Sequence, residues 1–351
     1  MKILFDVAHL YYLPHFTPVI EQLISLGIKA GIVFHHKAPS KIKLGLNNNV
    51  SIYEIAENDI MDFYQQKHAD WIIFGHASEH AKQINAFAKT GMILHGLGPK
   101  STYYNASSGD IQYRFVESQE RCDTLQQLYP DKTFVTTGYT KLDPIINNHI
   151  NKLHLPSLGL DPKKKTILYS PTFYPSTIEN FPKSWPEHFS DYNILIKPHY
   201  FSLIKKSYKK QRILLKHWQK YDNVYLADIN EQSLLPFMHT ADIMISETSS
   251  ALFEFMALDK PIIVCHFLKL RLGYRGFLKY RLGKRLSDDY KLFSEIGSNI
   301  NKYQELTKAI QKNINNPQLY QAQRKHYTKQ IVGNVDGLSS KRVAEYLITR
   351  S

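Results

Sequence analysis

The chain has 351 residues, of which 43% are apolar, and a formal net charge of +13. This length exceeds one usual hydrophobic core, so we expect two domains, and the apolar content excludes a disordered chain. Two cysteines, Cys122 and Cys265, form neither a disulfide framework nor a set with metal-ligand spacing. The positive charge favours an anionic partner, and composition alone leaves nucleic acid, acidic lipid and phosphorylated substrates open.

The first eight residues resemble a signal sequence only superficially. Asp6 interrupts their apolar run, and no small-residue cleavage site follows. We interpret them as a buried strand. No run in the chain approaches the ~18–20 apolar residues of a membrane helix. A cytoplasmic protein is therefore expected.

Short apolar runs alternate with helical patterns along most of the chain. Strands are predicted at residues 2–7, 30–35, 71–74, 92–94, 113–116 and 133–136, and in a second series at 166–170, 193–197, 223–226, 243–246 and 261–265. Helices are predicted at 18–26, 118–128 and 234–240. This alternation predicts α/β domains whose parallel sheets are covered on both faces.

The apolar rhythm breaks at residues 147–165, where His, Asn, Pro and Lys become frequent. We place the linker there, between a first domain at 1–150 and a second at 151–351. Residues 304–351 read as terminal helices that pack back. Two Rossmann-like halves with a cleft between them are expected, with ligands at the carboxyl ends of the strands.

The most informative segment runs from Ser246 to Pro261, with a predicted strand, a hydroxyl-rich turn and a helical pattern. Thr248, Ser249 and Ser250 place hydroxyls where the first amides of a helix lack partners, an arrangement that binds anions. Glu254, one turn further, is placed to accept hydrogen bonds from a ribose diol. Ordinary capping explains any single hydroxyl. Three of them with a glutamate favour a nucleotide diphosphate.

Three other predicted strand ends carry polar side chains. His95 precedes a glycine-rich turn, and neutral imidazole is the usual general base for an alcohol. A turn-capping histidine is the competing interpretation. Lys197 and His199 follow another strand and suit a phosphate clamp, or form a solvated basic loop. Ser170 and Thr172 end a third strand, where hydroxyls bind a phosphate or satisfy the local backbone.

Motifs for cofactors and metals do not occur. The sequence contains no GxGxxG after the first strand, no GxxxxGK(S/T) loop and no HExxH spacing. Its 16 histidines include an adjacent pair, His35 and His36, but no familiar ligand spacing. We therefore expect neither a cofactor nor a metal ion.

Residues 267–286 combine basic and bulky apolar side chains and contain no acid. The basic residues are Lys269, Arg271, Arg275, Lys279, Arg281, Lys284 and Arg285. Such a pattern favours a segment that lies on anionic lipid. A solvated basic face over a packed stripe and a nucleic-acid contact are the alternatives.

Taken in order, these motifs resemble those of the CDP-glycerol glycerophosphotransferase family, the teichoic-acid and capsule primases and polymerases of GT-B architecture. The motifs that carry the resemblance are His95-Gly96, the turn from Gly138 to Asp143, Ser170-Pro171-Thr172, Lys197-Pro198-His199 and the turn from Ser246 to Ser250. The chain departs from the family at Leu97-Gly98-Pro99-Lys100, at Phe173-Tyr174-Pro175-Ser176, and at Glu247, where the family carries Asp.

The resemblance implies a transferase in which an acceptor hydroxyl attacks the β-phosphorus of CDP-glycerol, or of a similar CDP-polyol, and CMP leaves. It implies that His95 is the base and that His199 and Lys197 stabilise charge on the diphosphate. The implied donor-binding residues are Ser170, Thr172, Glu247, Thr248, Ser249, Ser250 and Glu254.

The implied acceptor is a lipid-linked saccharide or a growing cell-surface polymer. Such an acceptor implies a peripheral position on the inner face of the cell membrane, and no nucleic-acid partner is expected. Two alternatives stay open: a GT-B glycosyltransferase that uses a nucleotide sugar, and a non-catalytic basic protein that binds lipid or RNA.

Overall fold

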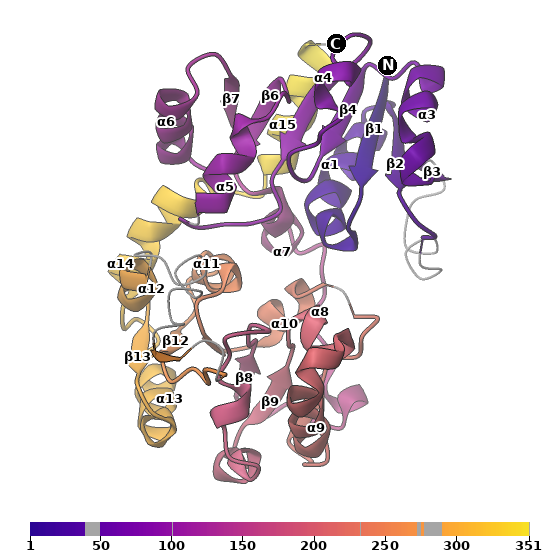
Figure 1. The fold of residues 1–351 in the computed structure, drawn as a ribbon. Coiled ribbons are helices and arrows are strands. Elements are labelled where there is room, and N and C mark those ends of the chain that lie inside the picture. The colour runs from indigo at the N-terminus through magenta and orange to yellow at the C-terminus, as the bar shows by residue number, and fades with distance from the viewer. Residues whose placement is uncertain (39–49, 100, 232, 272–274, 277–289, 351) are drawn as a thin grey trace. The chain divides into compact units, whose positions relative to one another are not determined.

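The computed structural model describes residues 1–38, 50–99, 101–231, 233–271, 275–276 and 290–350, and they form two compact α/β units (Figure 1). Unit 1 comprises Met1–His149 and Lys329–Ser351, and unit 2 comprises Ile150–Thr328. The sequence places residues 329–351 in the second domain, whereas the structure packs them with the first. The physical reason is the apolar face of the last helix, which is buried in the core of unit 1.

Unit 1 is built on a fully parallel sheet with the strand order β3-β2-β1-β4-β5-β6-β7. Its strands are β1 (Lys2–Val7), β2 (Lys29–Phe34), β3 (Val50–Glu54), β4 (Trp71–Phe74), β5 (Lys89–Ile93), β6 (Tyr113–Val116) and β7 (Thr133–Thr136). The order reverses between β1 and β4. In such sheets ligands bind beside this switch point, outside the carboxyl ends of the strands.

Helices cover the sheet of unit 1. They are α1 (Leu13–Ser25), α3 (Ile60–Lys67), α4 (Ala81–Ile84), α5 (Ser101–Asn105), α6 (Gln119–Leu128), α7 (Asp143–Ile146) and α15 (Ser339–Thr349). On one face α1 and α15 share a core with β1, β2 and β4 (Figure 1). The indole of Trp71 in β4 donates a hydrogen bond of 3.1 Å to the carbonyl of Leu347. The C-terminal helix is thus part of this core.

The turn from Gly138 to Asp143, one of the family-like motifs, holds the start of α15. Asp143 accepts hydrogen bonds from the backbone N–H and the hydroxyl of Ser340, at 2.6 and 2.5 Å. Gly138 has a φ of 95°, and a Cβ there would collide with the hydroxyl of Ser339. Only glycine suits this close approach, so the motif has a structural task.

Unit 2 has a second parallel sheet, with the order β10-β9-β8-β11-β12-β13. Its strands are β8 (Thr166–Tyr169), β9 (Asn193–Ile196), β10 (Val224–Leu226), β11 (Ile243–Ser246), β12 (Ile262–Cys265) and β13 (Ser298–Ile300). Its helices are α8 (Tyr200–Ile204), α9 (Lys209–Trp218), α10 (Leu235–Thr240), α11 (Ser250–Met256), α12 (Tyr290–Glu295), α13 (Leu306–Asn315) and α14 (Gln321–Tyr327). A π-helical turn at Thr328–Val332 leads the chain back to unit 1.

All eleven predicted strands correspond to observed ones, with ends that differ by at most three residues. The prediction missed two edge strands, β3 and β13. β3 is mostly half-buried or exposed, and β13 has three residues, so neither shows a continuous apolar run. The helix predicted at 18–26 begins earlier, at Leu13.

Candidate active site

His95 lies just beyond the carboxyl end of β5, and its hydrogen bonding defines its tautomer. Nδ1 lies 2.8 Å from the carbonyl oxygen of Gly75, which can only accept. Nδ1 therefore carries the proton, and in the neutral ring Nε2 has the basic lone pair. The pKa of His95 is lowered to about 4, mainly by burial and also by the nearby His76, His9 and Lys141. The hydrogen bond to the Gly75 carbonyl raises the pKa and only partly offsets these effects. The ring is neutral at physiological pH.

Aromatic rings surround His95. The ring centroids of Tyr11 and Tyr12 lie 4.9 and 5.0 Å from that of His95, and the Tyr103 ring lies 6.4 Å away. A Cβ at Gly75 would collide with the Tyr12 ring, and one at Gly96 would collide with Tyr103. The Gly96 turn was visible in the sequence. Gly75 and the tyrosines were missed, because only the fold brings them to His95.

A buried ion pair fixes the glycine-rich turn after His95. Arg121 of α6 donates 2.6 Å to the carbonyl of Gly98, lies 3.2 Å from Glu117 and stacks 4.1 Å from the centroid of the Tyr104 ring. Both charged side chains are buried. The turn that follows His95 is therefore anchored by a buried side chain.

His199, in unit 2, follows β9 and is exposed. It caps α8, and its Nδ1 accepts the backbone N–H of Phe201 at 3.1 Å. Nδ1 is thus unprotonated and Nε2 carries the proton. The ring packs against Phe173 and Phe201, at centroid distances of 4.6 and 5.0 Å. Nε2–H is a hydrogen-bond donor. Lys197, two residues earlier, is half-buried.

The hydroxyl-rich turn has the predicted strand–turn–helix arrangement. Thr248 and Ser249 lie between β11 and α11, Ser250 begins α11, and all three are half-buried. Ser249 caps the helix by accepting the N–H of Ala251 at 3.3 Å, as the competing interpretation expects. Its own O–H keeps a proton to donate. Glu254 on α11 is 3% exposed.

Glu247 is placed differently from the prediction. It is 0% exposed, and its Oε1 accepts from the N–H and hydroxyl of Thr177 at 2.6 and 2.5 Å and from Ser176 at 3.1 Å. Its Oε2 accepts the N–H of Thr172 at 2.8 Å. Burial raises the pKa of Glu247, and these hydrogen bonds oppose the rise. Because the loop engages both carboxylate oxygens, neither is left for a direct contact with a donor. Glu247 instead clamps the loop at 172–177.

Two further predicted donor ligands are engaged inside unit 2. The hydroxyl of Thr172 donates 2.8 Å to the carbonyl of Pro175. Ser170 is buried, and its carbonyl accepts the hydroxyl of Ser246 at 2.5 Å. The hydroxyl of Thr172 thus satisfies the local backbone, which is the alternative that the sequence left open. We correct the assignment of Thr172 from a direct ligand to a residue that supports the loop, and the role of the Ser170 hydroxyl stays a prediction.

The basic stretch at 267–286 is described only in part. Lys279, Arg281, Lys284 and Arg285 lie outside the described residues. Lys269 and Arg275 are exposed. Arg271 pairs with Glu179 at 3.3 Å and lies over the rings of Tyr174 and Tyr208, at 4.8 and 5.0 Å from their centroids. Arg271 therefore stabilises unit 2. Among the helices that the structure describes, none has the length and apolar character to span a bilayer.

A cavity of 240 Å³ opens beside the switch point of unit 1. His35 bridges two of its carboxylates: Nε2 lies 2.8 Å from Asp6, and Nδ1 lies 2.5 Å from Glu57. Burial opposes protonation of His35, but these hydrogen bonds and charges raise its pKa to about 9. Gly75 and Tyr12 also line the cavity, so it adjoins the surroundings of His95. The sequence analysis missed it, although Asp6 inside an apolar strand was a signal.

Comparison with known proteins identifies relatives by sequence. A sequence model of the family described as CDP-glycerol:poly(glycerophosphate) glycerophosphotransferase matches residues 53–349. A teichoic acid glycerol-phosphate primase of Bacillus spizizenii is 29% identical over 152 residues, which is 42% of this chain and 38% of the relative. The namesake of Bacillus subtilis is 28% identical over 167 residues, or 47% and 42%. The matched region thus spans under half the length of these relatives.

Solved structures are similar over nearly the whole chain. The wall teichoic acid polymerase TagF has a TM-score of 0.70 at 16% identity, covering 99% of this chain and 88% of the other. TagF soaked with CDPG, as a histidine-to-asparagine variant, has a TM-score of 0.67. The UDP-GlcNAc 2-epimerase of Neisseria meningitidis bound to UDP-GlcNAc has a TM-score of 0.62 at 15% identity, covering 99% and 100%. These likenesses confirm the predicted GT-B fold.

Proposed function

Because the chain belongs to the CDP-glycerol:poly(glycerophosphate) glycerophosphotransferase family, we propose that it transfers glycerol phosphate from CDP-glycerol to a hydroxyl group and releases CMP. The observation that carries the proposal is His95, a neutral imidazole whose lone pair is on Nε2. Such a group accepts the proton of an attacking alcohol.

The proton step follows from this tautomer. As the acceptor oxygen bonds to the β-phosphorus, its proton passes to Nε2 of His95. The Nδ1–H group keeps its hydrogen bond to the carbonyl of Gly75 throughout. A pKa of about 4 makes His95 a weak base before reaction. In a loose phosphoryl-transfer transition state the nucleophile forms little bond, so it needs little deprotonation in advance. Negative charge on the bound diphosphate also favours the imidazolium as it forms.

Unit 2 supplies the groups proposed for the leaving side. The bond between the β-phosphorus and the bridging oxygen breaks, and CMP takes the electron pair. Nε2–H of His199 donates to an oxygen of the diphosphate, and the ammonium of Lys197 offsets its charge. Because Nδ1 of His199 is engaged by the helix cap, Nε2 remains a donor when the ring is neutral.

The donor is held, in this proposal, by Thr248, Ser249, Ser250 and Glu254. The hydroxyls donate to phosphate oxygens, and Glu254 accepts from the ribose diol. The half-buried positions of the three hydroxyls support the assignment. Helix α11 has seven residues, so we ascribe binding to the side chains and leave its short dipole aside. Glu247 acts on the donor only through the loop that it clamps.

The proposed acceptor is a lipid-linked saccharide or a growing polymer. Teichoic acid primases and a teichoic acid polymerase are among the similar proteins. We propose that exposed Lys269 and Arg275 meet acidic lipid at the inner face of the membrane. The net charge of +13 supports an anionic surface as partner.

Product analysis tests the proposal. The purified chain is incubated with CDP-glycerol, CDP-ribitol or UDP-sugars, each with a lipid-linked disaccharide or a short glycerol-phosphate polymer. We expect CMP and a lengthened acceptor from CDP-glycerol. Release of UDP with no CMP would establish the nucleotide-sugar alternative. Absence of CMP with every CDP-polyol and acceptor would refute the proposal.

A further inference from the structure

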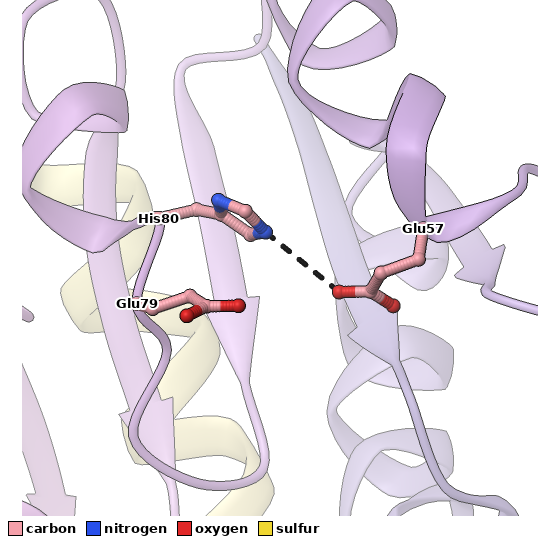
Figure 2. A group of neighbouring side chains, drawn as sticks. All are labelled: Glu57, Glu79 and His80. Atoms are coloured by element: carbon pink, nitrogen blue, oxygen red, sulfur yellow. Dashed lines mark ion pairs between the residues drawn. The ribbon is translucent and has the colours of Figure 1, made fainter.

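Three side chains at the mouth of the unit 1 cavity form a cluster that the proposed reaction does not use. Glu57 begins the 3-10 turn at Glu57–Asp59, and Glu79 and His80 lie between β4 and α4. Figure 2 shows both facing Glu57 across the gap. One potential ligand atom from each residue lies within 4.8 Å of the other two. Residues at the carboxyl ends of β1, β2 and β4 line the cavity, so the cluster lies at the switch point between β1 and β4.

The imidazole of His80 supplies an independent observation. The side chain is 26% exposed, but its Nε2 atom is shielded from solvent and has no hydrogen-bond partner among the described residues. Its ion-pair partner, Glu57 Oε1, is 3.7 Å away, which is too far for a hydrogen bond (Figure 2). Two ligands bound cis to one ion at about 2.1 Å lie roughly 3 Å apart, and trans ligands lie roughly 4.2 Å apart. The observed separation falls between these values.

A chain of hydrogen bonds orients Glu57. Its Oε2 is 2.5 Å from His35 Nδ1, His35 Nε2 is 2.8 Å from Asp6, and the hydroxyl of Tyr64 donates 2.6 Å to Asp6. With Oε2 engaged, Oε1 is the oxygen directed at His80. Outer hydrogen bonds of this kind commonly fix the carboxylate ligands of metal sites. The cluster therefore has an orienting shell, which a chance group of surface acids lacks.

We infer that Glu57, Glu79 and His80 bind one divalent transition-metal ion, with the remaining positions open to water or substrate hydroxyls. Two carboxylates and one imidazole suit Mn²⁺ or Zn²⁺ better than the all-oxygen preference of Ca²⁺ or Mg²⁺. The sequence predicts no metal ion because metal-binding motifs are recognised by short spacings between ligands along the chain. Here the ligands come from separate segments that only the sheet brings together.

Mn²⁺ binding to the EDTA-treated full chain tests this inference without any activity measurement. We expect one Mn²⁺ per chain by titration of the free-ion EPR signal, and pulsed EPR should detect coupling to one imidazole nitrogen. His80→Asn should abolish that coupling. His80→Asn and Glu79→Gln should each weaken binding about 10–100-fold. The matched controls His68→Asn and Glu120→Gln change exposed residues of unit 1 outside the cluster and should bind as wild type does.

Several outcomes would overturn the inference. These are no Mn²⁺ binding by the wild type, binding that survives the double variant H80N/E79Q, or bound Mn²⁺ without nitrogen coupling. Mn²⁺ should also raise the Tm of the wild type and leave that of the double variant unchanged, because an ion that binds only the folded state stabilises it. The wild-type stoichiometry and spectrum decide the question even if a variant folds poorly. A failed transfer assay has no bearing on either.

Discussion

His95 of unit 1 and His199 of unit 2, the two histidines proposed to be catalytic, are held in opposite ways. The imidazole of His95 is half-buried among aromatic rings, and its Nδ1–H donates to a carbonyl. The imidazole of His199 is exposed, and its Nδ1 accepts an N–H. The first ring therefore presents a lone pair at Nε2, and the second presents a proton there. The backbone partner of Nδ1, rather than the motif around each histidine, sets its chemical role.

Their supports differ as well. His95 is held by main-chain groups that follow β4 and β5. Its Nδ1–H donates to the carbonyl of Gly75, and the carbonyl of Gly98 accepts a hydrogen bond from the buried Arg121. The ring of His199 packs against Phe173, which belongs to the loop that Glu247 holds by hydrogen bonds. The proposed base in unit 1 is thus held by strand ends, and the proposed donor in unit 2 is held by a loop.

Asparagine in place of each histidine tests the contrast between His95 and His199, and it is expected to give the largest change in kcat. Asparagine cannot serve as a base, so His95→Asn should lower kcat about 10²–10⁴-fold. At position 199, asparagine can cap α8 with its oxygen and donate with its amide. His199→Asn should therefore cost less than about tenfold, and His199→Leu much more. Rates of CMP release measure all three.

Equal losses for His95→Asn and His199→Asn would show that the tautomers do not assign the roles. Near-UV circular dichroism serves as the control that each variant retains its packing. His68→Asn, at an exposed position with a φ of 47°, is the matched substitution and should leave the rate unchanged.

Much of this arrangement was predictable from the sequence. Buried parallel strands appear as apolar runs, so the strand ends that carry His95 and His199 were located before the structure. What escaped prediction depends on contacts between distant segments. The carbonyl of Gly75 that sets the tautomer of His95 belongs to another strand end. The burial of Glu247 could not be foreseen either, because a longer side chain in place of the family's Asp reaches the backbone of Thr177.

Glu247→Gln tests the loop that supports His199. The amide cannot accept the N–H of Thr172 and the donors of Thr177 and Ser176 together, so buried donors lose partners. We expect the free energy of unfolding to fall by about 2–3 kcal/mol. Because the loop also holds Phe173 against His199, kcat should fall too. Denaturant unfolding and CMP release measure the two effects.

The companion variant is Glu254→Gln, which changes the residue proposed to bind the ribose. It should raise the KM for CDP-glycerol, and it should lower the free energy of unfolding less than Glu247→Gln does. The loop assignment would be contradicted by a Glu247→Gln protein as stable as the wild type.

A neutral buried imidazole also predicts that the stability of unit 1 depends on pH. His15 of α1 is buried, and its Nδ1 has no hydrogen-bond partner in the described part of the chain. Burial, with Lys141 and His95 nearby, lowers its pKa well below 6.5. The unfolded state therefore binds a proton that the fold excludes, and stability falls as pH drops below ~6.5. From pH 7 to pH 5 this loss is about 2 kcal/mol.

His15→Gln should remove that part of the pH dependence, whatever it does to stability at pH 7. Unfolding by urea at both pH values gives the comparison. An unchanged difference between pH 7 and pH 5 in the variant would mean that His15 is not the group responsible.

The smallest effect concerns the pH profile of the reaction. His95 must be neutral to act as a base, and its pKa of about 4 keeps it neutral far below the range of an ordinary histidine. Between pH 7 and pH 5.5, kcat/KM should therefore change less than about twofold, whereas a base of pKa ~6.5 would lose about tenfold. Lys141→Met removes one positive charge that lowers this pKa, so the acid limb should move to higher pH. A limb at pH 6.5 in the wild type would assign the base to a more exposed imidazole, and the contrast between the two histidines would then have to be reversed.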